Sequence, residues 1–335
     1  MTYLRSMLVA CFCYGDKCLA RHCEERSDAA IQFLLALRAL DCRASLAMTK
    51  GEGIMPELPE VETTRRGLLQ ATKGQRITAV EVRRYDLRTP IPQNLMETLV
   101  GARITDVRRR AKYLLIDLDC GQILLAHLGM SGSFVVVPGE GYYPRTHDHV
   151  LITLKNGNKM VFHDPRRFGL MELLPTGTEA IHTLLKNLGP EPLLEGFTPR
   201  YLAAQLKRRT GAIKPVLMDQ KLVVGVGNIY ASESLYLCGL HPSLPAHGLA
   251  PKAAAIIDAI QVTLKAAIDS GGSTLRDYVG TQNEGGYFQH HFNVYGREGQ
   301  PCFRCATFIE TSVQAGRATY WCPQCQPLRG KRQKP

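Results

Sequence analysis

The stretch Met55-Pro56-Glu57-Leu58-Pro59-Glu60-Val61-Glu62 has the composition of a chain start that passes directly into a helix. Pro59 suits the first turn of a helix, because the N–H that proline lacks would have no partner there. Glu60 and Glu62 place negative charge at the end of the helix that its dipole favours. The apolar residues that follow keep helical spacing, and Gly74 predicts the end of this helix.

Pro56 is the chemically unusual residue of this stretch. If Met55 is the initiator and is removed, Pro56 carries a free secondary amine, which can attack an aldehyde carbon and form an iminium. Glu57 lies beside it and could move protons. A plain lead-in to the helix explains the same residues, so the rest of the chain must decide between the two interpretations.

The 335-residue chain is long enough for two domains with their own cores, and its formal net charge is +11. A basic excess of this size favours a polyanionic partner, with nucleic acid first and a membrane surface second. A basic surface that serves only solubility is the alternative. The sequence has no run of about 18 apolar residues, so no transmembrane helix is expected.

Residues 1–54 differ from the rest of the chain. They hold five of the 11 cysteines and no proline, and they make a poor signal peptide. The run 21–28 resembles translated intergenic repeat sequence. We therefore expect a misplaced start codon and a mature protein without this extension. If the extension stays attached, the nitrogen of Pro56 is an amide and cannot act as a nucleophile.

Residues 55–186 alternate short β-rich runs with turn signals, a pattern typical of a sandwich or barrel. Eight strands are predicted, at 77–82, 104–107, 113–118, 122–127, 132–137, 150–154, 159–163 and 171–174.

Short clusters between these strands carry candidate functional residues. Met130 lies between glycines in a predicted turn, where its side chain can be exposed, although a core Met is more frequent. The His-Asp-His run at 147–149 could bind a metal, or one His could contact a phosphate. Arg166 and Phe168 lie in a turn from which they could enter a nucleic-acid stack, and a surface turn with one buried ring is the alternative.

Residues 187–290 read as a helical domain, with helices predicted at 198–207, 214–220, 229–237 and 253–268. The glycine-rich turn at 223–228 separates two of them, and Asn228 is a natural N-cap. The free N–H groups of such a turn can hold a phosphate, and an ordinary corner in a core is the alternative. The polar, Gly-rich run 271–287 predicts a loop.

The strongest local signal lies in residues 291–327, where two Cys-x2-Cys pairs are separated by 16 residues. Four thiolates at this spacing predict a closed, tetrahedral zinc site, and a closed site is structural because it leaves no open coordination position. Its ligands are Cys302, Cys305, Cys322 and Cys325. The runs 307–313 and 318–321 predict a β-hairpin with Arg317 near its tip, and 328–335 reads as a basic tail.

The combination of these motifs in this order resembles bacterial formamidopyrimidine-DNA glycosylase over residues 55–326. The likeness rests on the Pro-Glu-Leu-Pro-Glu-Val-Glu start, Arg-Ala-Lys-Tyr-Leu-Leu, His-Leu-Gly-Met-Ser-Gly-Ser, Asp-Pro-Arg-Arg-Phe-Gly, the turn around 221–233 and the four-cysteine ribbon. The resemblance implies an α+β multidomain fold: an N-terminal helix with an eight-stranded β-sandwich, a helix-two-turn-helix domain and a zinc β-ribbon.

The resemblance also implies a base-excision repair enzyme that removes oxidised purines and then cleaves the backbone by β,δ-elimination. Pro56 matches the family's Schiff-base nucleophile and Glu57 its acid. Lys112 and Arg317 match the proton donors for β- and δ-elimination. The expected cofactor is one structural zinc. The expected partner is damaged duplex DNA, bound by a cytoplasmic monomer that needs no protein partner and no membrane.

Further positions are expected to bind DNA because they match the family's motifs. Met130, Arg166 and Phe168 match the trio that fills the gap left by a flipped nucleotide. The other matched positions are His147, Arg209, Lys214, Asn228 and Tyr230.

Three other functions fit parts of the sequence. An endonuclease VIII-like glycosylase for oxidised pyrimidines would share the fold and the proline chemistry. A non-catalytic DNA-binding protein would need no free Pro56, and a zinc-ribbon protein could bind RNA instead. Cleavage of lesion-bearing duplexes, and competition between duplex DNA and RNA at stated salt, separate these possibilities.

Overall fold

The computed structural model describes residues 56–273 and 287–328, all of which belong to one compact unit, Gly53–Pro335. The expectations for the extension 1–54, for most of the loop at 271–287 and for the end of the basic tail fall outside the described residues. None of the described helices combines the length and apolar character needed to cross a bilayer.

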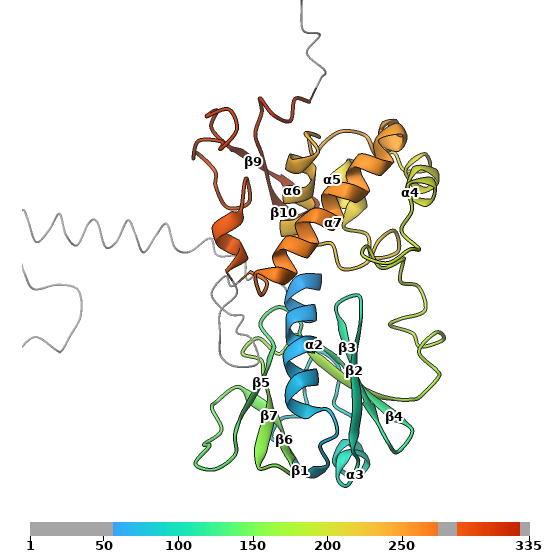
Figure 1. Ribbon diagram of the computed structural model, residues 1–335, viewed down its shortest axis with the longest axis vertical. Coiled ribbons are helices and arrows are strands. Elements are labelled where there is room, and N and C mark those ends of the chain that lie inside the picture. The colour runs from blue at the N-terminus through green and yellow to red at the C-terminus, as the bar shows by residue number, and fades with distance from the viewer. Residues whose placement is uncertain (1–55, 274–286, 329–335) are drawn as a thin grey trace, which may run out of the picture. The chain divides into compact units, whose positions relative to one another are not determined.

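The predicted first helix is present as α2, Leu58–Thr72, with Glu57 in the extended conformation of an N-cap. Its apolar residues divide between two cores. Leu58 packs into the core of the helical region, whereas Val61 and Leu68 pack into the core of the β-sandwich. The helix therefore joins the two regions (Figure 1).

All eight predicted strands of the N-terminal region are present and form two four-stranded antiparallel sheets, ordered β1-β6-β7-β5 and β2-β3-β4-β8. Their bounds are β1 Ile77–Val82, β2 Ile104–Arg110, β3 Tyr113–Leu118, β4 Gln122–His127, β5 Ser133–Pro138, β6 Asp148–Leu154, β7 Asn158–His163 and β8 Leu170–Pro175. The short helix α3, Leu95–Leu99, was not predicted, and it adds Leu95 and Leu99 to the sandwich core.

Strand β2 continues three residues beyond its predicted end, because its cationic residues remain paired with β3. Arg108 faces outward and forms an ion pair with Asp117 at 2.6 Å, and Arg109 reaches Glu62 on α2 at 3.1 Å. Their charges are thus neutralised locally, which the hydrophobic pattern alone does not reveal.

The helical region consists of α4 Pro199–Leu206, α5 Ile213–Leu217, α6 Asn228–Leu237, the 3-10 helix η1 Ala246–Lys252 and α7 Ala253–Asp269. The four predicted helices are present, although α5 ends at Leu217, before its predicted end at residue 220. Helix η1 was not predicted. Buried residues such as Leu206, Ile229 and Ile260 form a continuous core with Leu58 of α2.

The C-terminal region holds η2 Phe288–His291 and the predicted hairpin of β9 Glu310–Gln314 and β10 Arg317–Trp321. Ala315 and Gly316 both have positive φ (48° and 73°), as a two-residue hairpin turn with the twist of its strands requires. The ribbon packs on α6 through a small core that includes Tyr236, Val294 and Ile309.

Candidate active site and nucleic-acid interface

The centre of the site is the place where the start of α2 meets the start of α6. The carboxylate of Glu57 accepts hydrogen bonds from the backbone N–H groups of Gly227 at 2.8 Å and Ile229 at 2.9 Å. A Cβ atom at Gly227 would lie 2.3 Å from Cδ of Glu57, so this approach requires glycine. Pro56, which is buried, is thereby held beside the N-termini of two helices.

The interpretation of Asn228 as the N-cap of this helix, with free N–H groups for a phosphate, is wrong. Gly227 occupies the N-cap position and Asn228 begins the helix. The N–H groups at the turn bind Glu57 instead, so a side chain of the protein supplies the negative charge that this helix end favours. The side chain of Asn228 accepts a hydrogen bond from Lys214 at 2.6 Å.

Burial controls the ionisation of Glu57, which is 3% exposed. Desolvation raises the pKa of Glu57 from 4.5 to about 7, with the charge of Glu60 adding to the rise and that of Lys112 and the backbone N–H groups opposing it. A carboxyl group with this pKa is partly protonated at neutral pH and can act as a general acid.

Glu60 fixes the backbone behind Glu57. Its carboxylate accepts hydrogen bonds from the N–H of Glu57 at 2.9 Å, the hydroxyl of Tyr230 at 2.5 Å, and the N–H and hydroxyl of Ser273 at 2.8 and 2.9 Å. These contacts connect α2 and α6 to Ser273, which lies after the end of α7. Tyr230 is fully buried, so it supports the site from within.

Lys112 projects from the turn between β2 and β3 and is 7% exposed. Burial lowers the pKa of Lys112, while the charges of Glu57 and Glu60 oppose this change and that of Arg317 adds to it. These interactions place Lys112 among the two carboxylates and the arginine of the ribbon.

The turn that carries Lys112 is fixed by the linker to the helical region. Ala111 has a positive φ of 54°, an unusual conformation for a residue with a Cβ atom. Its N–H donates to Oε1 of Glu191 at 2.7 Å, and Glu191 also forms ion pairs with Arg109 at 2.7 Å and Arg110 at 2.9 Å.

Arg317 is exposed at the tip of the ribbon hairpin, as predicted. The strand behind it is attached to α5 and α6 by Lys214, which is 1% exposed. The ammonium group of Lys214 donates to the carbonyl of Ala318 at 2.9 Å and the hydroxyl of Thr319 at 2.7 Å. Lys214 thus connects the helical region to the ribbon.

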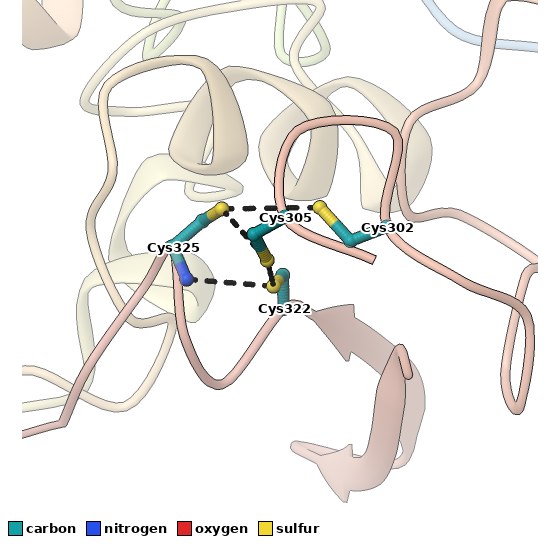
Figure 2. Close-up of side chains that lie close together, drawn as sticks. All are labelled: Cys302, Cys305, Cys322 and Cys325. Atoms are coloured by element: carbon teal, nitrogen blue, oxygen red, sulfur yellow. Dashed lines mark hydrogen bonds between the residues drawn. The ribbon is translucent and has the colours of Figure 1, made fainter. Parts of the chain in front are cut away.

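Figure 2 shows the four ribbon cysteines with their sulfur atoms turned toward one another. All four lie within 4.8 Å of one another, and three of the S···S separations are 3.4, 3.5 and 3.8 Å. Sulfur atoms around a tetrahedral zinc lie about 3.8 Å apart, since each Zn–S bond is about 2.3 Å. Cys302, Cys305, Cys322 and Cys325 therefore fit one structural zinc, whose role is to hold the two knuckles of the ribbon together.

A second group of candidate residues lies on loops of the β-sandwich. His147, Arg166 and Phe168 are exposed and Met130 is half-buried. The guanidinium of Arg166 lies 5.2 Å from the centre of the Phe168 ring, so the two side chains form one cation–aromatic unit. A Cβ atom at Gly129 would lie 2.3 Å from the carbonyl carbon of Phe168, so the two loops touch backbone to backbone.

Comparison with known proteins identifies the family. Three family models match: the formamidopyrimidine-DNA glycosylase N-terminal domain over residues 55–171, its H2TH domain over 188–279, and the zinc finger found in FPG and IleRS over 299–328. A formamidopyrimidine-DNA glycosylase of Xanthomonas euvesicatoria pv. vesicatoria (strain 85-10) is 51% identical over 273 residues, which are 81% of this chain and 100% of that protein. The chain belongs to the formamidopyrimidine-DNA glycosylase family.

Solved structures of this glycosylase family share the fold. The Lactococcus lactis protein in complex with DNA containing an abasic site has a TM-score of 0.75 and 34% identity, covering 81% of this chain and 99% of that one. The protein MutM in complex with DNA containing carbocyclic 8-oxoguanine has a TM-score of 0.74 and 35% identity, covering 81% of this chain and 100% of that one.

The structure places the predicted residues in three groups. Pro56, Glu57 and Lys112 lie near the junction of α2 and α6, with Arg317 near enough to affect Lys112. Met130, His147, Arg166 and Phe168 form the loop group. The remaining predicted DNA-binding residues make contacts within the protein: Lys214, Asn228, Tyr230 and Arg209, which binds Gln205 at 2.8 Å and Asp219 at 3.2 Å.

Sequence reasoning missed three acidic residues that organise this site: Glu60, Asp164 and Glu191. Glu60 and Asp164 are buried and Glu191 is half-buried, and each accepts hydrogen bonds from a distant part of the chain. Glu60 was interpreted only as a charge in the first turn of a helix, and Glu191 only as part of a linker. Glu60 and Asp164 lie within three positions of the candidates Glu57 and Arg166, which could have drawn attention to them, whereas no sequence signal marks Glu191.

Proposed function

We propose that this chain removes oxidised purines from duplex DNA through a Schiff base on Pro56 and then excises the sugar by β,δ-elimination. The enzyme class follows from family membership: the chain is a DNA glycosylase and AP lyase of base-excision repair that acts on damaged DNA. The preference for purines is supported by the 8-oxoguanine-containing DNA bound to MutM.

One observation carries the proposal: the start of α2 is fixed against α6 by Glu57, with the buried Lys112 nearby. The free amine of Pro56 would lie at this junction. The positive ends of two helices point toward it, and their field favours the neutral, nucleophilic form of the amine.

In the proposed reaction the damaged nucleotide leaves the double helix and its C1′ reaches Pro56. The nitrogen of Pro56 forms a bond to C1′ as the bond from C1′ to the base breaks, and the proton that the amine loses goes to the departing base. Glu57 donates a proton to the sugar ring oxygen as the bond from C1′ to that oxygen breaks, which leaves the iminium. The resulting iminium makes the proton on C2′ acidic, and its loss expels the 3′ phosphate. Lys112 assists this β-elimination and Arg317 the δ-elimination of the 5′ phosphate, leaving a one-nucleotide gap.

The mechanism requires that Pro56 be the mature N-terminus, because an amide nitrogen cannot form the iminium. Two observations support this requirement. The family model begins to match at residue 55, and the aligned 81% of this chain covers 100% of the Xanthomonas relative. The proposed domains are 55–186 for catalysis, 187–290 for DNA binding and 291–327 for the zinc ribbon, and the proposed form is a cytoplasmic monomer.

The test is cleavage of matched duplexes by protein that begins at Pro56. We expect cleavage of a duplex containing 8-oxoguanine to be faster than that of a duplex containing thymine glycol, with a one-nucleotide gap as product. Faster cleavage of thymine glycol would assign the chain to the endonuclease VIII-like alternative. Duplex binding without cleavage of either substrate would support the non-catalytic alternative.

A further inference from the structure

Asp164 lies at the point where the loops of the predicted gap-filling residues meet, and it forms no ion pair with the residues at 56–273 and 287–328. It is 0% exposed. Its Oδ1 accepts the hydroxyl hydrogen of Ser131 at 2.7 Å, and its Oδ2 accepts the N–H of Gly169 at 2.8 Å. The two oxygens of one carboxylate therefore connect the loop after β4 to the loop after β7.

Ser131 completes this connection in the other direction. Its hydroxyl oxygen accepts the backbone N–H of Arg166 at 3.1 Å while its hydrogen goes to Asp164. Met130 is the neighbour of Ser131 in the chain, and Phe168 is the neighbour of Gly169. The polar frame thus attaches to the backbone directly beside all three predicted gap-filling side chains.

The backbone of Asp164 extends the frame to a third segment. Its N–H donates to the carbonyl of His147 at 3.0 Å, and its carbonyl oxygen lies 2.8 Å from Nε2 of His149. His147 is the predicted phosphate contact of the sandwich. The same residue therefore sets the distance between a phosphate contact and the side chains expected to enter the stack.

The two glycines beside these hydrogen bonds are tightly packed. A Cβ atom at Gly169 would lie 2.5 Å from the Phe162 ring and 3.0 Å from Oδ2 of Asp164. A Cβ atom at Gly129 would likewise collide with the backbone of Phe168. Because both loops touch through glycine backbone, the hydrogen bonds of Asp164 determine their relative position.

The structure assigns Asp164 as a positioning residue for base extrusion: its carboxylate holds Met130, Arg166 and Phe168 in register with His147 so that they enter the gap together. This assignment rests on the proposed function. It predicts that Asp164 matters where a stacked duplex must be opened and filled, and matters little where the sugar is already accessible to Pro56.

The experiment compares two substrates in single-turnover reactions of protein that begins at Pro56. One is a duplex containing 8-oxoguanine, scored by base excision. The other is a single-stranded oligonucleotide with an abasic site, scored by borohydride trapping. The variants are Asp164→Ala, which removes both acceptors, and Ser131→Ala, which removes only the link between loops and keeps the assignment testable if Asp164→Ala does not fold.

Matched controls come from the same sandwich. Asp117→Ala removes a carboxylate that pairs with Arg108 on β2, away from these loops. Ser133→Ala removes a hydroxyl that is 4% exposed, similar to the 3% of Ser131, and that has no described hydrogen bond to Asp164.

We expect Ser131→Ala to lower duplex excision about fivefold. Asp164→Ala, which also leaves the N–H of Gly169 unpaired, should lower it at least about tenfold, as for the loss of buried hydrogen bonds. Single-strand trapping and both controls should stay near wild type. An equal loss on both substrates, or no loss on the duplex, would overturn the assignment. If the unmutated protein traps no abasic DNA, the proposed Schiff-base chemistry itself fails, and the assignment with it.

Discussion

The carboxylate of Glu57 accepts a hydrogen bond from the backbone N–H of Ile229 at 2.9 Å, although 172 positions separate the two residues in the chain. The proposed acid is therefore fixed by the helix turn of the predicted DNA-binding region. A shift of α6 on DNA would move Glu57 directly. The arrangement explains how a residue just before the first residue of α2 can have a defined position.

Glu57 should make stability depend on pH. Burial raises the pKa of Glu57 from 4.5 to about 7, so the folded state binds more protons than the unfolded state between these values. The contribution of Glu57 to the free energy of unfolding is fully present below pH 4.5 and is lost as pH rises through 7. The total contribution is on the order of 3 kcal/mol. Urea unfolding of the 335-residue chain from pH 4.5 to 8 measures this slope. Glu57→Gln should flatten it, and an unchanged slope in that variant would contradict the assigned pKa.

The same pKa predicts the pH dependence of excision. If Glu57 donates a proton as the sugar opens, single-turnover base excision should fall as pH rises through about 7. Glu57→Gln should be slow at every pH, with no inflection near neutrality. An excision rate that rises steadily from pH 6 to 8 would show that ionised Glu57, or no Glu57 proton, is used.

Lys112 should affect cleavage more than Schiff-base formation. Replacing it with Met keeps most of the apolar contact and removes the amine, so the iminium should still form while β-elimination slows about a hundredfold. Borohydride trapping and strand cleavage on the same abasic duplex measure the two steps. Lys73→Met removes an exposed lysine that pairs with Asp106, and it serves as the control. Equal loss of trapping and cleavage would place Lys112 in the first step instead.

Lys214 should stabilise the fold rather than contact DNA, because it is buried and bound to Asn228, Ala318 and Thr319. Lys214→Met leaves these acceptors without their donor and should lower the free energy of unfolding by about 2–4 kcal/mol. Urea unfolding measures the loss, and δ-elimination should fall more than β-elimination because Arg317 precedes Ala318. Unchanged stability with weaker DNA binding would restore Lys214 as a direct DNA contact.

Removal of the zinc should unfold the ribbon and leave the sandwich intact. Trp321 is the only tryptophan of the chain, lies next to Cys322 and packs on His241 with ring centres 5.0 Å apart. Its fluorescence therefore reports the ribbon alone. A chelator strong enough to remove a structural zinc should shift the emission to longer wavelength, and added zinc should reverse the shift. No shift after verified zinc loss would mean that the ribbon folds without the metal.

The hydrophobic pattern predicted the strands well because each is a short run that contains buried apolar residues and is bounded by clear turn signals. Strands β1, β3 and β4 match their predicted bounds, and the four-cysteine ribbon follows from spacing alone. Helix α3 and η1 were missed because they are short and their apolar residues do not extend over enough turns to show a period.

The site was less predictable, because it depends on contacts between distant residues. Local preference favoured Asn228 as a cap, whereas Glu57 satisfies that helix end from the other side of the protein. Lys214 follows the basic run 207–209 and Tyr230 follows the polar Asn228 by two positions, yet both are buried. Charge and motif identify which residues matter, but whether a cation contacts DNA or another protein atom depends on tertiary packing.

The central claim is that the amine of Pro56 attacks the sugar, and borohydride trapping tests it most directly. Protein that begins at Pro56 and the chain with residues 1–55 attached should be compared on the same duplex containing 8-oxoguanine, with Pro56→Gly as a reference. We predict a covalent complex at Pro56 for the first protein and none at this residue for the second. Equal trapping by the extended chain, verified as uncleaved by mass spectrometry, would contradict the claim.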